Sequence, residues 1–145
     1  MLMGRRAVHC GGHGAGQAAK LANNLVLAVT MAGVAEGLAL GRRLGLDPAL
    51  LSDVFDSSSA QSWVTSSYSP CPGVMEGVPS SVGYRGGFAS VLMVKDLLLA
   101  LRSDPGAPLP MTKQALQLYE KVTAADPALD FSAIYEVYGS GEPGK

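Results

Sequence analysis

A proline-free stretch from about residue 14 to residue 44 constrains the fold more than any other feature of the sequence. Alanine, leucine and other good helix formers fill most of it, which predicts one helix of ~28 residues, roughly 42 Å long. Its large apolar residues are Leu21, Leu25, Val26, Val29, Val34, Leu38 and Leu40. They fall on all sides of such a helix, so we expect other helices to surround it. Gly33, Gly37 and Gly41, at four-residue spacing, would clear one stripe where a neighbouring helix comes close.

Shorter helical patterns follow this central helix. Asp47 and Pro48 supply an N-cap and a first-turn proline for the next one, and Asp130 can cap the last. Serines weaken the pattern at 57–68, and proline and glycine exclude a regular element at 69–87. The helices that we expect are 48–56, a weak one within 57–68, 88–102, 111–125 and 131–138. Together with the central helix they predict an all-α helical bundle.

The two ends of the chain differ from this helical pattern. Residues 7–10, Ala-Val-His-Cys, are β-prone and predict a short strand remnant. We therefore divide the chain into a strand and turn at 1–13, an all-helical domain at 14–138 and a disordered tail at 139–145. The first residues lack the apolar run of a secretion signal, so we expect a truncated rather than a targeted start.

The composition limits the partners that this chain can have. At 145 residues it is one domain, and its net charge of −1 gives no basic footprint for nucleic acid or anionic lipid. Hydrophobic residues make up 48% and charged residues only 16%, so some apolar surface should meet a partner chain or domain. Asn23, Asn24 and Glu36 interrupt the apolar run of the central helix, which favours a buried helix over a membrane span. Cys10 and Cys71 fit a reducing compartment.

A glycine-rich turn at residues 11–16 opens the central helix. Its glycines let the backbone approach a ligand, and the free N–H groups of the first helical turn suit a carboxylate or phosphate. Lys20 and Asn24 lie four residues apart, so both project from one helix face. The bland alternative is a solvated lysine beside an incidental asparagine. Residues 14–19 also satisfy a G-x-G-x-x-A dinucleotide fingerprint, but the second strand that such a unit needs does not follow.

The spacing of these residues resembles a known motif. Gly11-x-x-Gly14-x-Gly16-x-x-x-Lys20-x-x-Asn23-Asn24 is similar to the catalytic-lysine motif of the β-hydroxyacid dehydrogenases, the family of 3-hydroxyisobutyrate dehydrogenase. Three later stretches, 72–80, 84–88 and 92–97, resemble 3-hydroxyisobutyrate dehydrogenases in particular. The likeness covers only the second half of such an enzyme, without the nucleotide-binding domain that normally precedes the motif. It implies that residues 14–138 form a substrate-binding and dimerisation domain.

The resemblance assigns proton transfer to Lys20. This lysine would act as general acid and base, and burial near a helix N-terminus would lower its pKa from the ordinary value of about 10.4. Asn24 would hold the same substrate oxygen or the substrate carboxylate, and Gly14 and Gly16 would bind substrate through the turn. Trp63 could line the substrate pocket, although aromatic residues at helical spacing more often belong to the core.

Lys95 and Phe88 are the residues that we expect to contact the cofactor. The apolar stripe predicted for the helix at 88–102 consists of Phe88, Val91, Leu92, Leu98 and Leu99. Lys95 interrupts this stripe, so it should extend to solvent, pair with a carboxylate such as Asp96, or meet an anionic ligand. In the resembled family the corresponding lysine contacts the dinucleotide. The resemblance thus implies a cofactor contact for Lys95 and a place in the cofactor or substrate wall for Phe88.

The function that the resemblance implies is oxidation of a 3-hydroxy acid with NAD or NADP, here 3-hydroxyisobutyrate to methylmalonate semialdehyde in valine catabolism. The chain would form homo-oligomers, would be inactive alone, and would work inside the cell, in a mitochondrial matrix or a bacterial cytoplasm. Two alternatives stay open, a non-catalytic helical self-association module and a related tartronate or succinic semialdehyde reductase. No metal is expected, because no Cys, Asp or Glu completes a site with His9 and His13.

Overall fold

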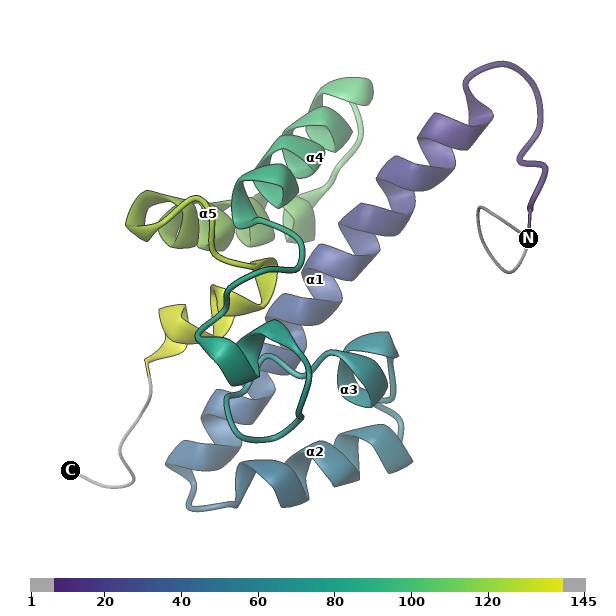
Figure 1. Cartoon of the computed structure of the whole chain (residues 1–145). Helices are drawn as coiled ribbons and strands as arrows, with labels where there is room; N and C mark the ends of the chain where they lie inside the picture. The colour runs from purple at the N-terminus through teal and green to yellow at the C-terminus, as the bar shows by residue number, and fades with distance from the viewer. Residues whose placement is uncertain (1–6, 140–145) are drawn as a thin grey trace.

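The structure is helical throughout the part of the chain that it describes. This computed structural model describes residues 7–139, and they contain no sheet. The elements are α1 (Ala15–Arg43), α2 (Pro48–Ser57), α3 (Trp63–Ser67), the 3₁₀ helix η1 (Pro79–Val82), α4 (Ser90–Ser103), α5 (Pro110–Ala125) and the 3₁₀ helix η2 (Phe131–Tyr138). All of them pack on α1 directly or through a neighbour (Figure 1). The expected all-α class around one long helix is confirmed.

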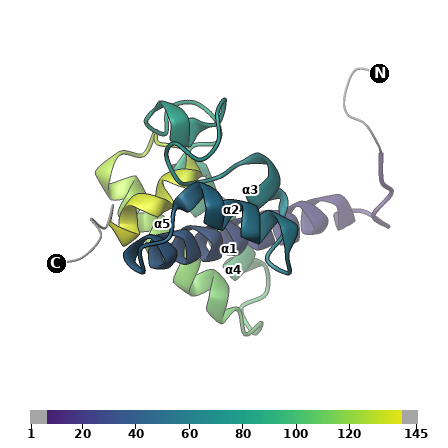
Figure 2. The ribbon, with the colours of Figure 1, turned by 90° about the horizontal axis from the view of Figure 1, so that it is seen from below.

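Helix α1 is the axis of the fold, but its neighbours cover only part of it. Its buried residues begin at Ala28 and end at Gly41. Helix α4 runs beside its N-terminal half (Figure 1), and its first turns extend past the other helices in the second view (Figure 2). Val26 is 60% exposed and Leu40 is 58% exposed. The expectation that helices surround α1 on all sides is therefore wrong within residues 7–139.

The glycines of α1 explain how closely α2 approaches it. A Cβ at Gly37 would lie 3.1 Å from the ring of Phe55, and a Cβ at Gly41 would overlap Leu51. Both contacts come from α2, which crosses the C-terminal end of α1 (Figure 1). Gly33 faces open space instead. The predicted close approach along the glycine stripe therefore holds for two of its three positions.

By length and composition alone, α1 could also cross a membrane. The mean hydropathy of its most apolar 18-residue window is 1.6, and 44% of that window is buried by the rest of the described chain. Core helices of water-soluble proteins pass the same test. The property therefore carries no assignment to a membrane, and the preference for a buried helix stays a prediction.

Local sequence signals located most helix boundaries. The Asp47 side chain accepts a hydrogen bond from Leu50 N–H (2.9 Å) and caps α2, as predicted. The weak helix predicted within 57–68 is present as the five-residue α3. One expectation between α2 and α4 was wrong, since η1 forms inside the stretch at 69–87 that we expected to be irregular.

Helix α4 turns a different face inward from the one that the apolar pattern predicted. Its buried residues are Ser90, Met93, Asp96, Leu97 and Ala100. Val91, Leu92 and Leu99 of the predicted stripe are between 41% and 44% exposed. Apolar residues occur on both faces of α4, so apolar content alone does not identify the buried face. As a result Asp96, and not Lys95, lies on the side that faces the core.

The N-terminal end of the described chain lacks the strand that the sequence predicted. Residues 7–10 form no strand, contrary to the predicted strand remnant, because a strand needs a partner for its backbone groups and residues 7–139 provide no sheet. Residues 1–6 and the tail at 140–145 lie outside the described residues. Cys10 is exposed, Cys71 is buried, and both are free thiols.

A buried carboxylate fastens the long connection between α3 and α4 to the core. Asp130 is fully buried, and its Oδ2 accepts hydrogen bonds from the Tyr68 hydroxyl (3.0 Å) and Phe88 N–H (2.7 Å). Its Oδ1 accepts from the backbone N–H and the hydroxyl of Ser132, at 2.9 and 2.6 Å. A buried charge is tolerated only when its oxygens are bonded in this way. Asp130 therefore holds residues 68–88 in place, a segment whose one regular element is the short helix η1.

Gly87 tests this arrangement, and its neighbour Gly86 is a matched control. Both have a positive φ, 68° and 79°, so alanine at either position strains the backbone by about 1–2 kcal/mol. A Cβ at Gly87 would also overlap the Asp130 carboxylate and the Tyr68 hydroxyl, whereas a Cβ at Gly86 meets nothing. We expect Gly87→Ala to lower the free energy of unfolding in urea by about 3 kcal/mol or more. Equal losses in the two variants would contradict this packing.

Candidate active site

Side chains from α1 and α4 meet around a hollow beside the exposed half of α1, here called the lysine hollow. Lys20 and Asn24 reach it from α1, and Lys95 and Asp96 reach it from α4. Its volume is about 300 Å³. Its lining residues are Gln17, Lys20, Leu21, Asn24, Lys95, Asp96 and Leu99. Three predicted site residues, Lys20, Asn24 and Lys95, are therefore brought together from elements far apart in the sequence.

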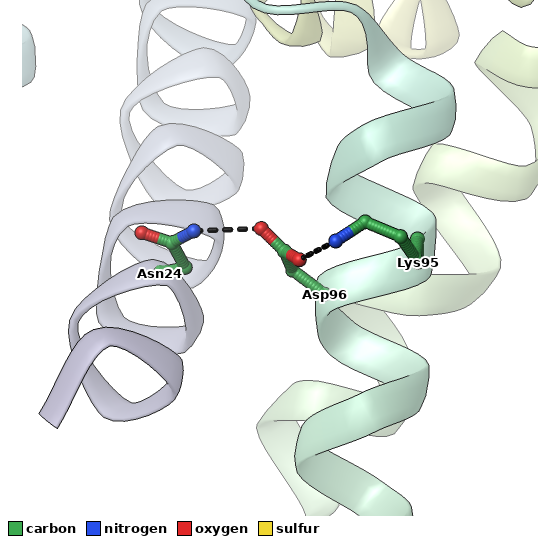
Figure 3. Close-up of polar contacts among 3 residues, drawn as sticks. All are labelled: Asn24, Lys95 and Asp96. Carbon is green, nitrogen blue, oxygen red and sulfur yellow. Dashed lines mark hydrogen bonds and ion pairs between the residues drawn. The ribbon is translucent and has the colours of Figure 1, made fainter. Parts of the chain in front are cut away.

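Asp96 joins the two helices across the lysine hollow. Its side chain is only 7% exposed, and its Oδ2 accepts a hydrogen bond from Asn24 Nδ2 at 2.7 Å (Figure 3). Its Oδ1 accepts from the Lys95 ammonium. Burial by itself raises the pKa of Asp96, but the hydrogen bonds from Lys95 and Asn24 and the charges of Lys95 and Lys20 outweigh it, so the pKa is lowered. Asp96 is therefore a carboxylate at neutral pH.

Lys95 forms an ion pair with Asp96, which is one of the three arrangements expected for it. The Lys95 side chain is 55% exposed, so the pair lies at the surface on the lysine side and is buried on the carboxylate side. An exposed pair of this kind contributes only about 0–1 kcal/mol to stability. The Lys95 ammonium, which has three donors and uses one on Asp96, remains accessible to an anionic ligand.

Lys20 lines the lysine hollow but is not buried. Its side chain is exposed, because α4 flanks one side of this part of α1 and leaves the rest uncovered (Figure 1). The predicted burial of Lys20 is therefore wrong for residues 7–139. Lys20 does lie close enough to Asp96 for its charge to stabilise that carboxylate.

The glycine turn starts α1 but does not line the lysine hollow. Gly14 is the N-cap, with a φ of 85° that glycine adopts readily. The N–H groups of Ala15 and Gln17 donate to the carbonyl oxygens of Gly12 and Gly14, each at 3.1 Å, so neither is free for an anion. A Cβ at Gly16 would meet nothing within 4 Å. Substrate contacts by Gly14 and Gly16 stay a prediction.

Trp63 and Phe88 lie apart from the lysine hollow. Trp63 is 51% exposed, stacks on Tyr68 with ring centroids 4.8 Å apart, and lines a separate hollow of about 400 Å³. That hollow also includes Asn23, the neighbour of Asn24 on the next face of α1. Phe88 is half-buried and packs edge-on against Phe131, with centroids 6.0 Å apart. Their predicted roles at substrate and cofactor stay predictions.

The sequence pattern pointed to Asp96 only as a partner for Lys95, and the contact of Asp96 with Asn24 was not predicted. The two residues are 72 positions apart, and no local pattern joins them. One signal was available. Asp96 and Leu97 are neighbours in an apolar helix, and a carboxylate on the buried face of such a helix needs a donor from another element. A correct assignment of the buried face of α4 would therefore have predicted that Asp96 bonds to a donor on another helix.

Comparison with known proteins identifies the family. Residues 14–138 match the family model described as the NAD-binding domain of NADP-dependent 3-hydroxyisobutyrate dehydrogenase. The chain belongs to the 3-hydroxyisobutyrate dehydrogenase family. It is 47% identical over 141 residues to the 3-hydroxyisobutyrate dehydrogenase of Pseudomonas aeruginosa, covering 94% of this chain and 47% of that protein. It is 48% identical over 137 residues to a probable mitochondrial 3-hydroxyisobutyrate dehydrogenase of Dictyostelium discoideum, covering 92% of this chain and 43% of that protein.

A solved structure of the family has the same helical arrangement. The structure of the 3-hydroxyisobutyrate dehydrogenase of Mycobacterium tuberculosis with L-serine matches with a TM-score of 0.87 and 38% identity. The match covers 92% of this chain and 46% of that one. The chain therefore spans less than half the length of these relatives, and the resemblance to this family noted in the sequence is confirmed.

The lysine hollow fits one polar group of a dinucleotide rather than the whole molecule. Its volume is at the lower end of the range for small-molecule sites, and its donors are the amines of Lys20 and Lys95. Dinucleotides are held at the turn between a strand and a helix, and residues 7–139 form no strand. Within residues 7–139 the lysine hollow therefore offers at most one wall of an NAD or NADP site, and the cofactor contact of Lys95 stays a prediction. The same residues contain no group of three or more His, Cys, Asp or Glu side chains placed to hold a metal.

The bond between Asn24 and Asp96 gives a prediction for stability, with Asn23 as a matched control. Asn24→Leu removes a donor from a buried carboxylate and should lower the free energy of unfolding by about 1–3 kcal/mol at neutral pH. Asn23 is exposed and makes only a 3.4 Å contact with Asn24, so Asn23→Leu should change it by no more than about 0.5 kcal/mol.

The loss caused by Asn24→Leu should shrink in acid. The lowered pKa of Asp96 stabilises the folded state above the unfolded value of about 3.9, and this contribution disappears as the pH falls through the folded pKa. Urea unfolding of both variants between about pH 7 and about pH 3 measures the difference. A loss for Asn24→Leu that does not depend on pH would contradict a bond to an ionised Asp96.

Proposed function

We propose that this chain carries the catalytic lysine of an NAD- or NADP-dependent dehydrogenase that oxidises 3-hydroxyisobutyrate to methylmalonate semialdehyde in valine catabolism. One observation supports this most directly. Lys20 and Asn24 of α1 meet Lys95 and Asp96 of α4 at one open hollow. Membership of the family supplies the substrate class, and the presence of two mitochondrial relatives and a bacterial one is consistent with an enzyme that works inside the cell.

The residues of the lysine hollow have distinct parts in this proposal. Lys20, as a neutral amine, accepts the proton of the substrate hydroxyl and becomes an ammonium, and it returns that proton in the reverse reaction. Asn24 binds the same substrate oxygen. Lys95 binds an anionic part of the cofactor with the donors that Asp96 leaves free. When bound, the nicotinamide supplies the acceptor for the hydride that leaves the substrate carbon.

The chain alone should be inactive, because its half of the site is open. Lys20 is exposed, the part of α1 that carries it is uncovered, and the lysine hollow holds at most one part of a dinucleotide. Water reaches every group there, whereas hydride transfer between substrate and cofactor requires both to be held in one geometry. A nucleotide-binding domain that covers this half of α1 would complete the site.

The chain should also self-associate, and the outer surface of α2 is where we place the contact. The large apolar residues exposed on α2 and around the α1–α2 connection are Leu40, Leu44, Leu46, Leu50 and Val54. Leu50 and Val54 are one helical turn apart and so share a face. A surface with this many exposed apolar side chains is typical of a protein–protein contact.

A fusion enzyme tests the catalytic role of Lys20. In it, residues 7–139 of this chain replace the matching region of the Pseudomonas aeruginosa relative. Lys20→Met removes the proton acceptor and should lower kcat for 3-hydroxyisobutyrate oxidation by about 10²- to 10⁴-fold. Lys113→Met, on the exposed side of α5, is the control and should leave kcat unchanged.

Each other outcome of this experiment has a meaning. An unchanged rate in the Lys20→Met fusion enzyme would overturn the role of Lys20. A folded fusion enzyme with no activity in its unsubstituted form would favour the non-catalytic helical module. Faster turnover of tartronate or succinic semialdehyde than of the 3-hydroxyisobutyrate pair would favour the related reductases.

The self-association surface gives a separate prediction. Leu50→Glu introduces a charge into the apolar face of α2 and should shift the purified chain from an oligomer to a monomer, measured by light scattering after size exclusion. Val82→Glu is the control, because Val82 is as exposed (62%) but lies on η1. If the unsubstituted chain is already a monomer, or if Leu50→Glu leaves the mass unchanged, this surface is not the contact.

A further inference from the structure

The two oxygens of Asp96 are divided between two different donors. Oδ2 accepts from Asn24 on α1 at 2.7 Å, and Oδ1 accepts from Lys95 on its own helix (Figure 3). Asp96 is the most buried of the charged groups around the lysine hollow, with a side chain 7% exposed against 55% for Lys95. Both are strong hydrogen bonds, because the acceptor is an ionised carboxylate.

This arrangement decides how the amide of Asn24 is oriented. An ionised carboxylate can accept hydrogen bonds but cannot donate them, so only the NH₂ group of Asn24 can face Asp96. The carbonyl oxygen of Asn24 then points away from α4, as Figure 3 shows. The two ends of an asparagine amide are nearly equal in shape, so without a charged neighbour either end could face α4.

We propose that Asp96 is a positioning residue for the reaction, because it fixes the amide of Asn24 in the one orientation that serves Lys20 and the substrate. In that orientation the carbonyl oxygen of Asn24 accepts only a long contact from Asn23 Nδ2 (3.4 Å) among the described residues, which leaves it available to an N–H of Lys20. The second N–H of Asn24 is available to the substrate oxygen. A flipped amide would exchange these donor and acceptor positions. The inference rests on the proposed function, since it concerns the same site.

The charges around the lysine hollow exclude a different role for Asp96. Among the described residues that line it, the charged ones are Lys20 on α1 and Lys95 and Asp96 on α4. Asp96 is bonded on both oxygens and kept ionised by these two lysines, so it is a poor acceptor for a substrate proton. Asp96 therefore acts through Asn24 and Lys20 and not on the substrate.

The fusion enzyme with Asp96→Asn tests this positioning. The new amide keeps the shape of Asp96 and can pair with Asn24 in either orientation, so kcat should fall by about 10- to 100-fold while KM changes little. Asp126→Asn, in an ion pair with Arg85 away from the site, is the matched control and should change neither quantity.

Two further variants separate positioning from structure. Asp96→Glu keeps an acceptor-only group and should restore part of kcat. The double variant Asn24→Asp with Asp96→Asn keeps a hydrogen bond and the charge count but reverses donor and acceptor, so it should retain the melting temperature and still have low kcat. Wild-type kcat in Asp96→Asn would overturn the proposal, as would full activity in the reversed pair. If none of the variants folds, the contact is structural and the proposal fails too.

These outcomes are distinguishable from failure of the proposed function. If Lys20→Met leaves oxidation intact, or the unsubstituted fusion enzyme is inactive, the proposed function is wrong. If the fusion enzyme is active and depends on Lys20 but is indifferent to Asp96→Asn, only the positioning role is wrong.

Discussion

The hydrogen bond from Asn24 to Asp96 is the interaction on which the site depends. The core of α1 begins at Ala28, one turn beyond Asn24, so this bond holds α4 to α1 at the point where apolar packing ends. A hydrogen bond to a charged group contributes about 1.5–3 kcal/mol, more than a neutral one. It thus keeps the two helices that carry Lys20 and Lys95 in register at the edge of the fold, where no buried side chain of α1 could do so.

The same boundary explains why one helix serves two purposes. From Ala28 to Gly41, α1 is packed by its neighbours, and its glycines let α2 approach closely. Before Ala28 it is exposed and carries the polar groups of the lysine hollow. A continuous helix transmits the rigidity of its packed half to its exposed half, because its backbone hydrogen bonds are all internal. Functional side chains on the exposed half are therefore held by a rigid element instead of a loop.

Sequence patterns predicted the features that depend on neighbouring residues. The proline-free run predicted α1, and Asp47 with Pro48 predicted the start of α2, because helix formation and capping are local. Sequence patterns failed for features that depend on packing against another helix. The face that α4 buries, the exposure of Lys20 and the partner of Asp96 are all set by helices distant in the sequence. The strand expected at 7–10 failed for the same reason, since its partner strands are not among residues 7–139.

The exposure of Lys20 bears on what a cover over this half of α1 would add. In the open lysine hollow, water reaches Lys20 and the exposed Lys95 end of the ion pair. Asp96 is already bonded to Asn24 and to Lys95, so the α4 side of the hollow is ordered before anything covers it. Groups that are held in place beforehand do not have to rearrange when a ligand is enclosed. A cover would therefore exclude water from the lysine hollow without moving Asn24 or Asp96.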